Sequence, residues 1–289
     1  MTSNNKFQVL KRIRKNTVDS LLTTLEKAIN MGKISELEFK NIWLENLEKN
    51  PEIFSKGWYD PPPDGVIVLF GDEKNVDRVS PKSIRPEQFW PKENVYLNKE
   101  RGLAFLYASP VDRQTGIIGD FGLSIYFGND PKIRDHYKKS YESVLEIFQA
   151  IEVGMKFKDI AKLGKRILAS RGLSSMLSSP SDPTGTNIGH SLVGIIPEWT
   201  EDELKMAETD WDSFKELIRT KRIFINEIEE FEVKPGMAFT LEPRPESLID
   251  SSLPMVYFHI VVLIQEDGKK ELLNEFGEIF KLVGMDYLL

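Results

Sequence analysis

The sequence predicts an α+β protein built from two similar halves, and the repetition of one pattern carries this prediction. A pair of helical segments contains Ala-Ile-x-x-Gly at residues 28–32, and a second pair contains it at residues 150–154. Short apolar, β-branched runs typical of buried strands follow each pair. A repeat of about 120 residues indicates a duplicated fold with a site where the halves meet. Two unrelated helical hairpins would give the same pattern by coincidence.

We assign residues 7–130 to the first half, after a polar tail at residues 1–6 that we expect to be disordered. Apolar residues recur at helical spacing over residues 7–29, and Ser35 is expected to cap a second helix. A stiff connector with three consecutive prolines follows at residues 58–65. The expected strands of this half are residues 66–70, 103–108 and 116–127.

The second half spans residues 131–289 and begins with helices expected at residues 137–150 and 158–171. His136 stands at the start of the first of these helices, and we interpret it as a surface residue. A Ser/Pro-rich loop is expected at residues 174–184, followed by a charged, partly helical segment at 201–230. The expected strands of this half are residues 236–241, 255–265 and 271–273, with Glu266-Asp-Gly268 as the hairpin turn between the last two.

The length allows one large globular domain or two small ones, and we assign residues 1–289 to a single domain with no separate domain before it. The net charge of −7 argues against nucleic acid or an anionic membrane as the main partner. The absence of cysteine excludes disulfides, thiolate metal sites and a cysteine nucleophile. No signal peptide and no apolar run of about 20 residues is present, so we expect a cytoplasmic protein.

Glu242 is the first candidate site residue, because it stands at the end of an apolar, strand-like run at residues 237–241. Pro243 follows it and cannot donate to a sheet, so strand pairing should stop at this point. A carboxylate fixed at the end of a buried strand is costly unless a cation or a proton meets it. An ion pair with a lysine or arginine is the simpler explanation, and a metal ion is the alternative.

Three further polar side chains lie in apolar or glycine-rich strand contexts: Asp120, His190 and His259. Taken singly, His259 is more typical of a buried core histidine, and Asp120 of a turn. Taken together with Glu242, they supply two carboxylates and two imidazoles, a set that suits one divalent ion of Zn, Mn, Fe or Co. We therefore predict Asp120, Glu242, His259 and His190 as metal ligands, with His190 and Glu242 as the candidate catalytic residues.

These stretches resemble the pita-bread metallohydrolases, which include methionine aminopeptidases, Xaa-Pro aminopeptidases, prolidases and creatinase. Residues 235–243 read Pro-Gly-Met-Ala-Phe-Thr-Leu-Glu-Pro and are similar to the family's Pro-Gly-Met-x-Phe-Thr-Ile-Glu-Pro. Residues 120–128 and 258–268 resemble two further ligand-bearing segments of the family. The resemblance covers residues 7–289 and implies the pita-bread fold, with pseudo-twofold symmetry. It is also the only ground for expecting a homodimer.

Family members bind two metal ions through two Asp, one His and two Glu residues, and the resemblance carries this set over only in part. Asp120 matches the second Asp and Glu242 the first Glu. The final Glu falls on His259, which can still coordinate a metal. The first Asp, eleven residues before Asp120, falls on Ser109, and Asp112 lies nearby but out of register.

The remaining family positions depend on how one loop is aligned. The family's Gly-His-x-Ile-Gly, read without gaps onto residues 185–189, places Thr186 at the His ligand. His190 replaces it only if the loop is shifted. In the ungapped reading the family's downstream His, which contacts the substrate, falls on Val193. The Arg-Thr pair after the second Asp is Leu-Ser at residues 123–124.

Three functional hypotheses follow from these departures. The first is a divergent enzyme with one metal ion that acts on a C–N bond of a peptide or of another small-molecule substrate. The second is a pseudo-peptidase that binds a peptide or a protein partner without chemistry, as the residues at Ser109, Thr186 and Val193 indicate. The third is a dinuclear aminopeptidase in which Asp112 and His190 replace the family ligands.

Overall fold

The fold is seen in a computed structural model, which describes residues 2–54, 65–175, 182, 184–194 and 199–289. The proline-rich connector at residues 58–64 and most of the loop at 174–184 lie outside the described residues. Within the described ranges, no helix is both long and apolar enough to cross a membrane.

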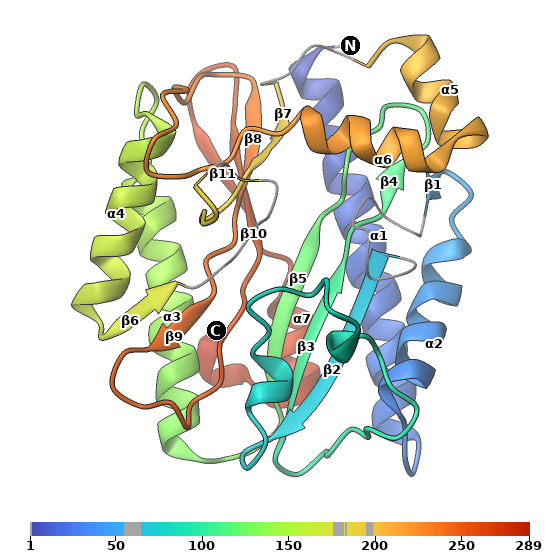
Figure 1. Cartoon of the computed structure of the whole chain (residues 1–289), viewed down its shortest axis with the longest axis vertical. Helices are drawn as coiled ribbons and strands as arrows, with labels where there is room; N and C mark the ends of the chain where they lie inside the picture. The colour runs from blue at the N-terminus through green and yellow to red at the C-terminus, as the bar shows by residue number, and fades with distance from the viewer. Residues whose placement is uncertain (1, 55–64, 176–181, 183, 195–198) are drawn as a thin grey trace.

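Two helix pairs flank the strands on opposite sides of the molecule (Figure 1). The first pair is α1 (Ser3–Asn30) with α2 (Glu36–Glu48), and the second is α3 (Pro131–Ala150) with α4 (Phe157–Ser170). This arrangement confirms both predicted hairpins. The expectation of a disordered tail at residues 1–6 is wrong for its helical part, because α1 begins at Ser3. Thr2 caps this helix by accepting a hydrogen bond from the Asn5 amide.

The strands form two main antiparallel sheets. The first has the order β2-β3-β5, with β2 at Val66–Asp72, β3 at Gly102–Ala108 and β5 at Phe121–Tyr126. The second has the order β11-β10-β8-β7, with β7 at Ser191–Val193, β8 at Met237–Leu241, β10 at Ile260–Ile264 and β11 at Lys270–Leu273. Each half of the chain therefore contributes one helix pair and one sheet, as the duplication predicts.

The two sheets meet edge to edge between β5 and the segment that precedes β10. The Ser124 amide donates to the carbonyl of Tyr257 at 2.7 Å, and the His259 amide donates to the carbonyl of Gly122 at 3.0 Å. Leu123 and Phe258 form an antiparallel bridge between these bonds. The strands predicted at residues 116–127 and 255–265 are therefore shorter than expected, because β5 and β10 cover only 121–126 and 260–264. The sheet junction lies at the first residues of β5 and just before β10.

The remaining elements surround these layers. They are the strand pairs β1 (Ile53–Phe54) with β4 (Val111–Asp112) and β6 (Leu173–Ser175) with β9 (Pro245–Ser247), the helices α5 (Glu201–Thr209), α6 (Trp211–Thr220) and α7 (Gly277–Val283), and the 3-10 turns η2 (Asp77–Val79), η3 (Glu87–Phe89) and η4 (Asp286–Leu288).

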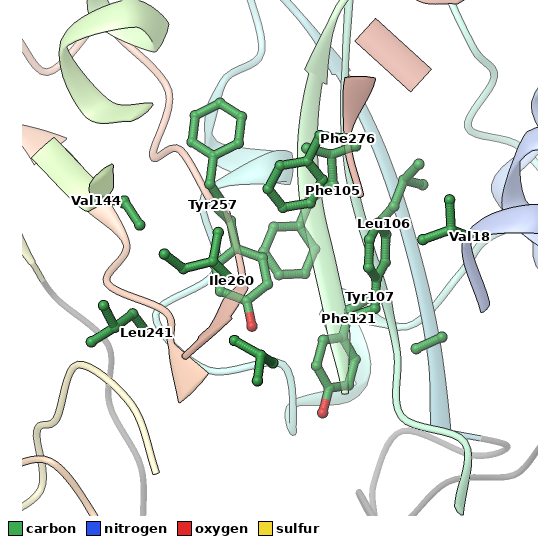
Figure 2. Packing of buried hydrophobic residues seen from close by; sticks show 14 of the residues in the cluster. Val18, Phe105, Leu106, Tyr107, Phe121, Val144, Leu241, Tyr257, Ile260 and Phe276 are labelled. Atoms are coloured by element: carbon green, nitrogen blue, oxygen red, sulfur yellow. The ribbon is translucent and has the colours of Figure 1, made fainter. Parts of the chain in front are cut away.

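Apolar side chains from both halves form one packed region at the sheet junction. Figure 2 shows Phe105 and Phe121 from the first half beside Tyr257 and Ile260 from the second. The rings of Phe105 and Tyr257 are stacked, with centroids 5.2 Å apart. All four side chains are fully buried. This packing fixes the backbone positions from which the polar site residues extend.

His136 corrects a prediction, because it is buried rather than on the surface. Its Nε2 lies 2.8 Å from the carbonyl oxygen of Pro254. Burial lowers the pKa of His136 below its ordinary value, although the hydrogen bond to Pro254 opposes this change. The sequence pattern missed this contact because the partner is a backbone carbonyl 118 residues away.

Candidate metal centre

The four predicted site residues lie at the ends of strands around the sheet junction. Asp120 directly precedes β5, His259 directly precedes β10, His190 directly precedes β7, and Glu242 directly follows β8. Thr240 in β8 connects two of them, because its hydroxyl accepts a hydrogen bond from the His190 amide and lies 3.5 Å from Oε1 of Glu242. Asp120 comes from the first half of the chain and the other three residues come from the second.

The ligand atoms of these residues converge on one point. Nε2 of His190 lies 3.1 Å from Oδ2 of Asp120 and 3.3 Å from Oε1 of Glu242. Nε2 of His259 lies 3.7 Å from the same Asp120 oxygen and 3.9 Å from Oε2 of Glu242. Four ligands at about 2.1 Å from a tetrahedral ion are about 3.4 Å apart. The two distances to Asp120 therefore have the spacing of a single coordination sphere, whereas Glu242 meets the two histidines through different oxygens and lies beside this sphere.

Three of these residues, Asp120, His190 and His259, each place a ligand atom within 4.8 Å of the others, and all three are buried. Nδ1 of His190 lies 3.0 Å from the carbonyl oxygen of Ser191, which can only accept, so Nδ1 carries the hydrogen. In neutral His190 the lone pair of Nε2 then points at two carboxylates. That arrangement is repulsive unless a proton or a cation lies between them.

Two further atoms of the cluster also need a bound proton or cation as a partner. Among the described residues, Oδ1 of Asp120 and Nε2 of His259 are buried and have no hydrogen-bond partner. Buried polar atoms of this kind are rare in folded proteins and call for an explanation such as a bound ion. The residues present therefore fit a divalent metal ion with three protein ligands, an arrangement typical of catalytic rather than structural sites.

The charges around Asp120 keep it ionised. Burial acts to raise the pKa of Asp120, but its imidazole neighbours His259 and His190 outweigh burial and hold this pKa well below its ordinary value. Tyr107 lies beside Asp120, and burial together with the Asp120 carboxylate raises the pKa of the Tyr107 phenol well above its ordinary value. Asp120 is therefore available as an anionic ligand, with a protonated phenol next to it.

Glu242 is held by a second buried phenol. The Tyr257 hydroxyl donates to Oε2 of Glu242 at 2.8 Å. Burial and the Glu242 carboxylate raise the pKa of Tyr257 well above its ordinary value, although Arg244 opposes this change. The phenol therefore remains a donor at neutral pH. Oε1 of Glu242 stays directed toward His190 and the centre of the cluster.

Arg14 of α1 also contacts the cluster, and sequence reasoning missed it. Its fully buried guanidinium donates to the backbone carbonyls of Asp120 and His259 and forms an ion pair with Glu275 at 2.8 Å. Its Nη1 lies 3.5 Å from Nδ1 of His259, a separation too long to fix the histidine tautomer. A signal was present in the sequence, because Arg14 occupies the apolar face of a helix, four residues after Leu10.

The structure also shows how the loop that carries the family's His ligand is aligned, which the sequence left open. Thr186 is exposed, whereas His190 lies in the cluster, so the loop is shifted by four residues from the ungapped alignment. The same shift moves the downstream His position from Val193 to Pro197, whose side chain has no hydrogen-bond donor. The ungapped placement of Thr186 is therefore wrong, whereas the departure at the downstream His position remains, with Pro197 in place of Val193.

Neither Ser109 nor Asp112 contributes a carboxylate to the cluster. Ser109 is buried, and its hydroxyl has no hydrogen-bond partner among the described residues. Asp112 pairs with Arg12 at 2.9 Å and accepts two hydrogen bonds from Thr115 at 2.8 and 2.7 Å. These contacts occupy both Asp112 oxygens away from the cluster. They disfavour a dinuclear site that depends on Asp112.

The fold and the buried histidine and carboxylate residues place the chain among the pita-bread metallohydrolases. Residues 111–269, more than half of the chain, match the sequence model of metallopeptidase family M24, and the chain belongs to this family. No curated protein sequence gives a significant match.

Solved structures with the same fold confirm the predicted architecture. They include the X-Pro aminopeptidase of Thermotoga maritima MSB8, with a TM-score of 0.60 and 11% identity over 93% of this chain and 60% of that one. A dipeptidase of Pyrococcus horikoshii OT3 gives 0.58 and 17% over 92% and 60%. Methionine aminopeptidase of Thermotoga maritima gives 0.58 and 14% over 91% and 95%. The chain thus spans about three fifths of the length of the first two proteins.

Proposed function

We propose that this protein is a metal-dependent hydrolase that uses one divalent ion to cleave a C–N bond in a peptide or another small-molecule substrate. The observation that carries this proposal is the convergence of Asp120, His190 and His259 on one buried point, with Glu242 beside it. Membership of metallopeptidase family M24 supports the same reaction type. The net charge of −7 favours a small substrate over nucleic acid or a membrane.

Charge balance favours one ion over two. The cluster contains two carboxylates, Asp120 and Glu242, and their charge matches that of a single divalent cation. Ser109 stands where the family resemblance implies an Asp, and His259 stands where it implies a Glu. Arg14, which is paired with Glu275, places a guanidinium 3.5 Å from Nδ1 of His259. A second divalent ion would therefore lack both ligands and counter-charge.

Each residue has a separate role in this proposal. Asp120, His190 and His259 hold the ion, and their mixed nitrogen and oxygen atoms suit Zn, Mn, Fe or Co. When bound, such an ion polarises the scissile carbonyl and lowers the pKa of the attacking water. Glu242 accepts the proton that this water loses, and Tyr257 orients Glu242 by donating to its other oxygen.

Metal analysis combined with an activity assay tests the proposal. Protein purified after expression in medium supplemented with Zn, Mn, Fe and Co should contain about one transition metal ion per chain. It should hydrolyse a panel of methionyl and Xaa-Pro dipeptides, and a chelator should remove this activity. Two ions per chain would favour the dinuclear alternative.

A pseudo-peptidase that binds peptides without chemistry is the second candidate, and the buried hydroxyl of Ser109 at a family ligand position favours it. This candidate predicts a chain that stays free of transition metal in the same supplemented medium and leaves every dipeptide of the panel intact.

A further inference from the structure

Arg244 is a buried arginine without an acidic partner. Its side chain is 4% exposed, and no carboxylate among the described residues forms an ion pair with it. Within the described part of the chain, the guanidinium donates one hydrogen bond, from Nη1 to the carbonyl of Pro81 at 3.0 Å. Nε is buried and has no partner in the described part of the chain. The guanidinium carbon lies 4.9 Å from the ring centroid of Tyr257 and 5.3 Å from that of Phe105.

Arg14, which is fully buried, and Arg78, whose side chain is 9% exposed, show how this protein treats such a charge elsewhere. Arg14 forms an ion pair with Glu275 at 2.8 Å, and Arg78 forms one with Glu36 at 2.5 Å. Removing a buried charge from water is costly, and a carboxylate partner normally offsets most of that cost. Arg244 is the exception among these three, so its partner is to be sought outside the described protein atoms.

The position of Arg244 connects it to the metal centre. It follows Glu242 by two residues, and the Tyr257 ring that it covers donates its hydroxyl to Glu242 at 2.8 Å. The Arg244 amide donates to the hydroxyl of Ser175 at 3.1 Å, within the pairing of β6 with β9. These contacts fix the guanidinium on the Glu242 side of the cluster.

We propose that Arg244 binds a carboxylate group of the substrate, beside the bond that is cleaved at the metal centre. This inference rests on the proposed function. A guanidinium presents parallel N–H donors that match the two oxygens of a carboxylate, and Nε of Arg244 has no hydrogen-bond partner among the described residues. The substrate class is therefore peptides or amino-acid derivatives with a free carboxylate, rather than amides or internal peptide segments.

Binding of a matched pair of ligands tests the proposal. Ala-Pro and Ala-Pro amide differ only in the carboxylate, and their affinities for the metal-loaded protein are measured by isothermal titration calorimetry, with turnover followed in the same samples. The wild-type protein should bind Ala-Pro at least 30-fold more tightly than the amide. The Arg244→Met variant should bind both within about threefold, and Arg244→Lys should keep an intermediate preference.

Two results would overturn the proposal: a wild-type protein that binds neither ligand or does not distinguish them, or an Arg244→Met variant that keeps the full preference. Preference without turnover has a different meaning. It would refute the hydrolase proposal and leave the carboxylate site in place, so the two failures can be separated.

Thermal stability separates ligand binding from a structural role. Arg244→Met removes an unpaired buried charge and keeps the apolar contacts of the stem, so Tm without ligand should stay the same or rise. Arg78→Met is the matched control, because it leaves Glu36 buried without its partner and should lower Tm. An Arg244→Met variant that loses as much Tm as Arg78→Met, or does not fold, would show that Arg244 is structural and would refute the proposal.

Discussion

At the residue scale, the cluster is defined by polar atoms that the protein leaves unsatisfied. Other buried polar side chains have partners, such as His136 with the carbonyl of Pro254 and Glu36 with Arg78. Oδ1 of Asp120 and Nε2 of His259 have none among the described residues, and they lie in the same cluster. Because an unpaired buried group destabilises the fold, a ligand that satisfies several of them at once has a large free energy to gain.

His259→Ala should abolish metal binding while the fold survives. The substitution removes one of three ligands and leaves a cavity beside Tyr257, so stoichiometry should fall from about one ion per chain to near zero. Asp120→Ala should have the same effect, because both residues contact the same ion. Elemental analysis measures the bound metal, and circular dichroism checks the fold.

His136→Ala is the control for this experiment. It also removes a buried imidazole, but His136 contacts Pro254 and not the cluster, so the variant should lose stability and keep its metal. If His259→Ala retained metal with wild-type affinity, His259 would be an ordinary core residue, and the proposed mononuclear site would have to be abandoned.

Arg14→Met should destabilise the protein by roughly 2–3 kcal/mol at neutral pH, because it leaves the Glu275 carboxylate without its partner. This cost is below that of a fully buried pair, since the Glu275 side chain is 28% exposed. Urea denaturation measures the difference between variant and parent. A loss below about 0.5 kcal/mol would contradict a stabilising role for the pair.

The effect of Arg14→Met should also depend on pH. Burial acts to raise the pKa of Glu275, but the Arg14 charge outweighs it and holds this pKa below the ordinary value of about 4.3. A depressed carboxyl pKa stabilises the fold above the unfolded pKa, and this stability is lost as pH falls through the folded pKa. The difference between parent and variant should therefore be full at pH 7 and shrink in acid.

Single site residues were predictable where a polar side chain interrupts a strand. Asp120, Glu242 and His259 were identified in this way, because a polar side chain stands out within or at the end of an apolar run. Arg14 and Arg244 were missed. A helix tolerates an arginine on its apolar face when a distant acid pairs with it, and the partner Glu275 is 261 residues away. The ungapped alignment misplaced the His ligand because it matched Ile188-Gly189 to the end of the family motif, although Gly189-His190 keeps the motif's Gly-His pair.

At the element scale, the junction between β5 and the segment before β10 positions the site. The segment carries His259, β5 follows Asp120, and the backbone hydrogen bonds between them set the separation of the two side chains. Gly122 is necessary for this close approach, because a Cβ atom there would lie 1.9 Å from Cε1 of Tyr257. The glycine thus allows the Tyr257 ring to lie against the strand and to reach Glu242.

Gly122→Ala should disturb both the junction and the site. The added methyl group pushes on a fully buried ring, and overpacking of this kind costs about 1–3 kcal/mol. Because Tyr257 holds Glu242, peptidase activity should fall more than the stability loss alone explains. Denaturant unfolding and kcat with the best dipeptide of the panel measure the two effects.

Gly32→Ala provides the control, because Gly32 is exposed and a methyl group added there would have no atom within 4 Å. This substitution should change stability by less than about 0.5 kcal/mol. Equal effects of the two alanine substitutions would contradict a specific role for Gly122 at the junction.

Element prediction from the sequence worked best where the determinants are local. Ser35 caps α2 in a reciprocal pair of hydrogen bonds with Glu38, as its position before an apolar run indicated. Strand ends were less predictable. The apolar run at residues 255–265 begins before β10, which starts only at Ile260. The sheet junction, and not the local sequence, determines where regular pairing begins.

At the scale of the whole molecule, the duplicated pattern was sufficient to predict the architecture, since each helix pair and sheet is determined by its own periodicity. The proposed metal ligands divide between the halves, with Asp120 in the first and His190 and His259 in the second, and Glu242 beside them also belongs to the second. An ion bound here would connect the two sheets across their junction. The metal should therefore act on the stability of the whole domain and not on one half.

Metal binding should raise Tm in a single unfolding transition. An ion at 100 times its Kd adds about 2.7 kcal/mol of stability. With an unfolding entropy of about 0.6 kcal/mol/K for 289 residues, Tm should rise by about 4 °C. Differential scanning calorimetry with zinc and with chelator measures this shift, which His259→Ala should lose. Two separate transitions, with metal moving only one, would show that the halves unfold independently and that the ion does not bridge them.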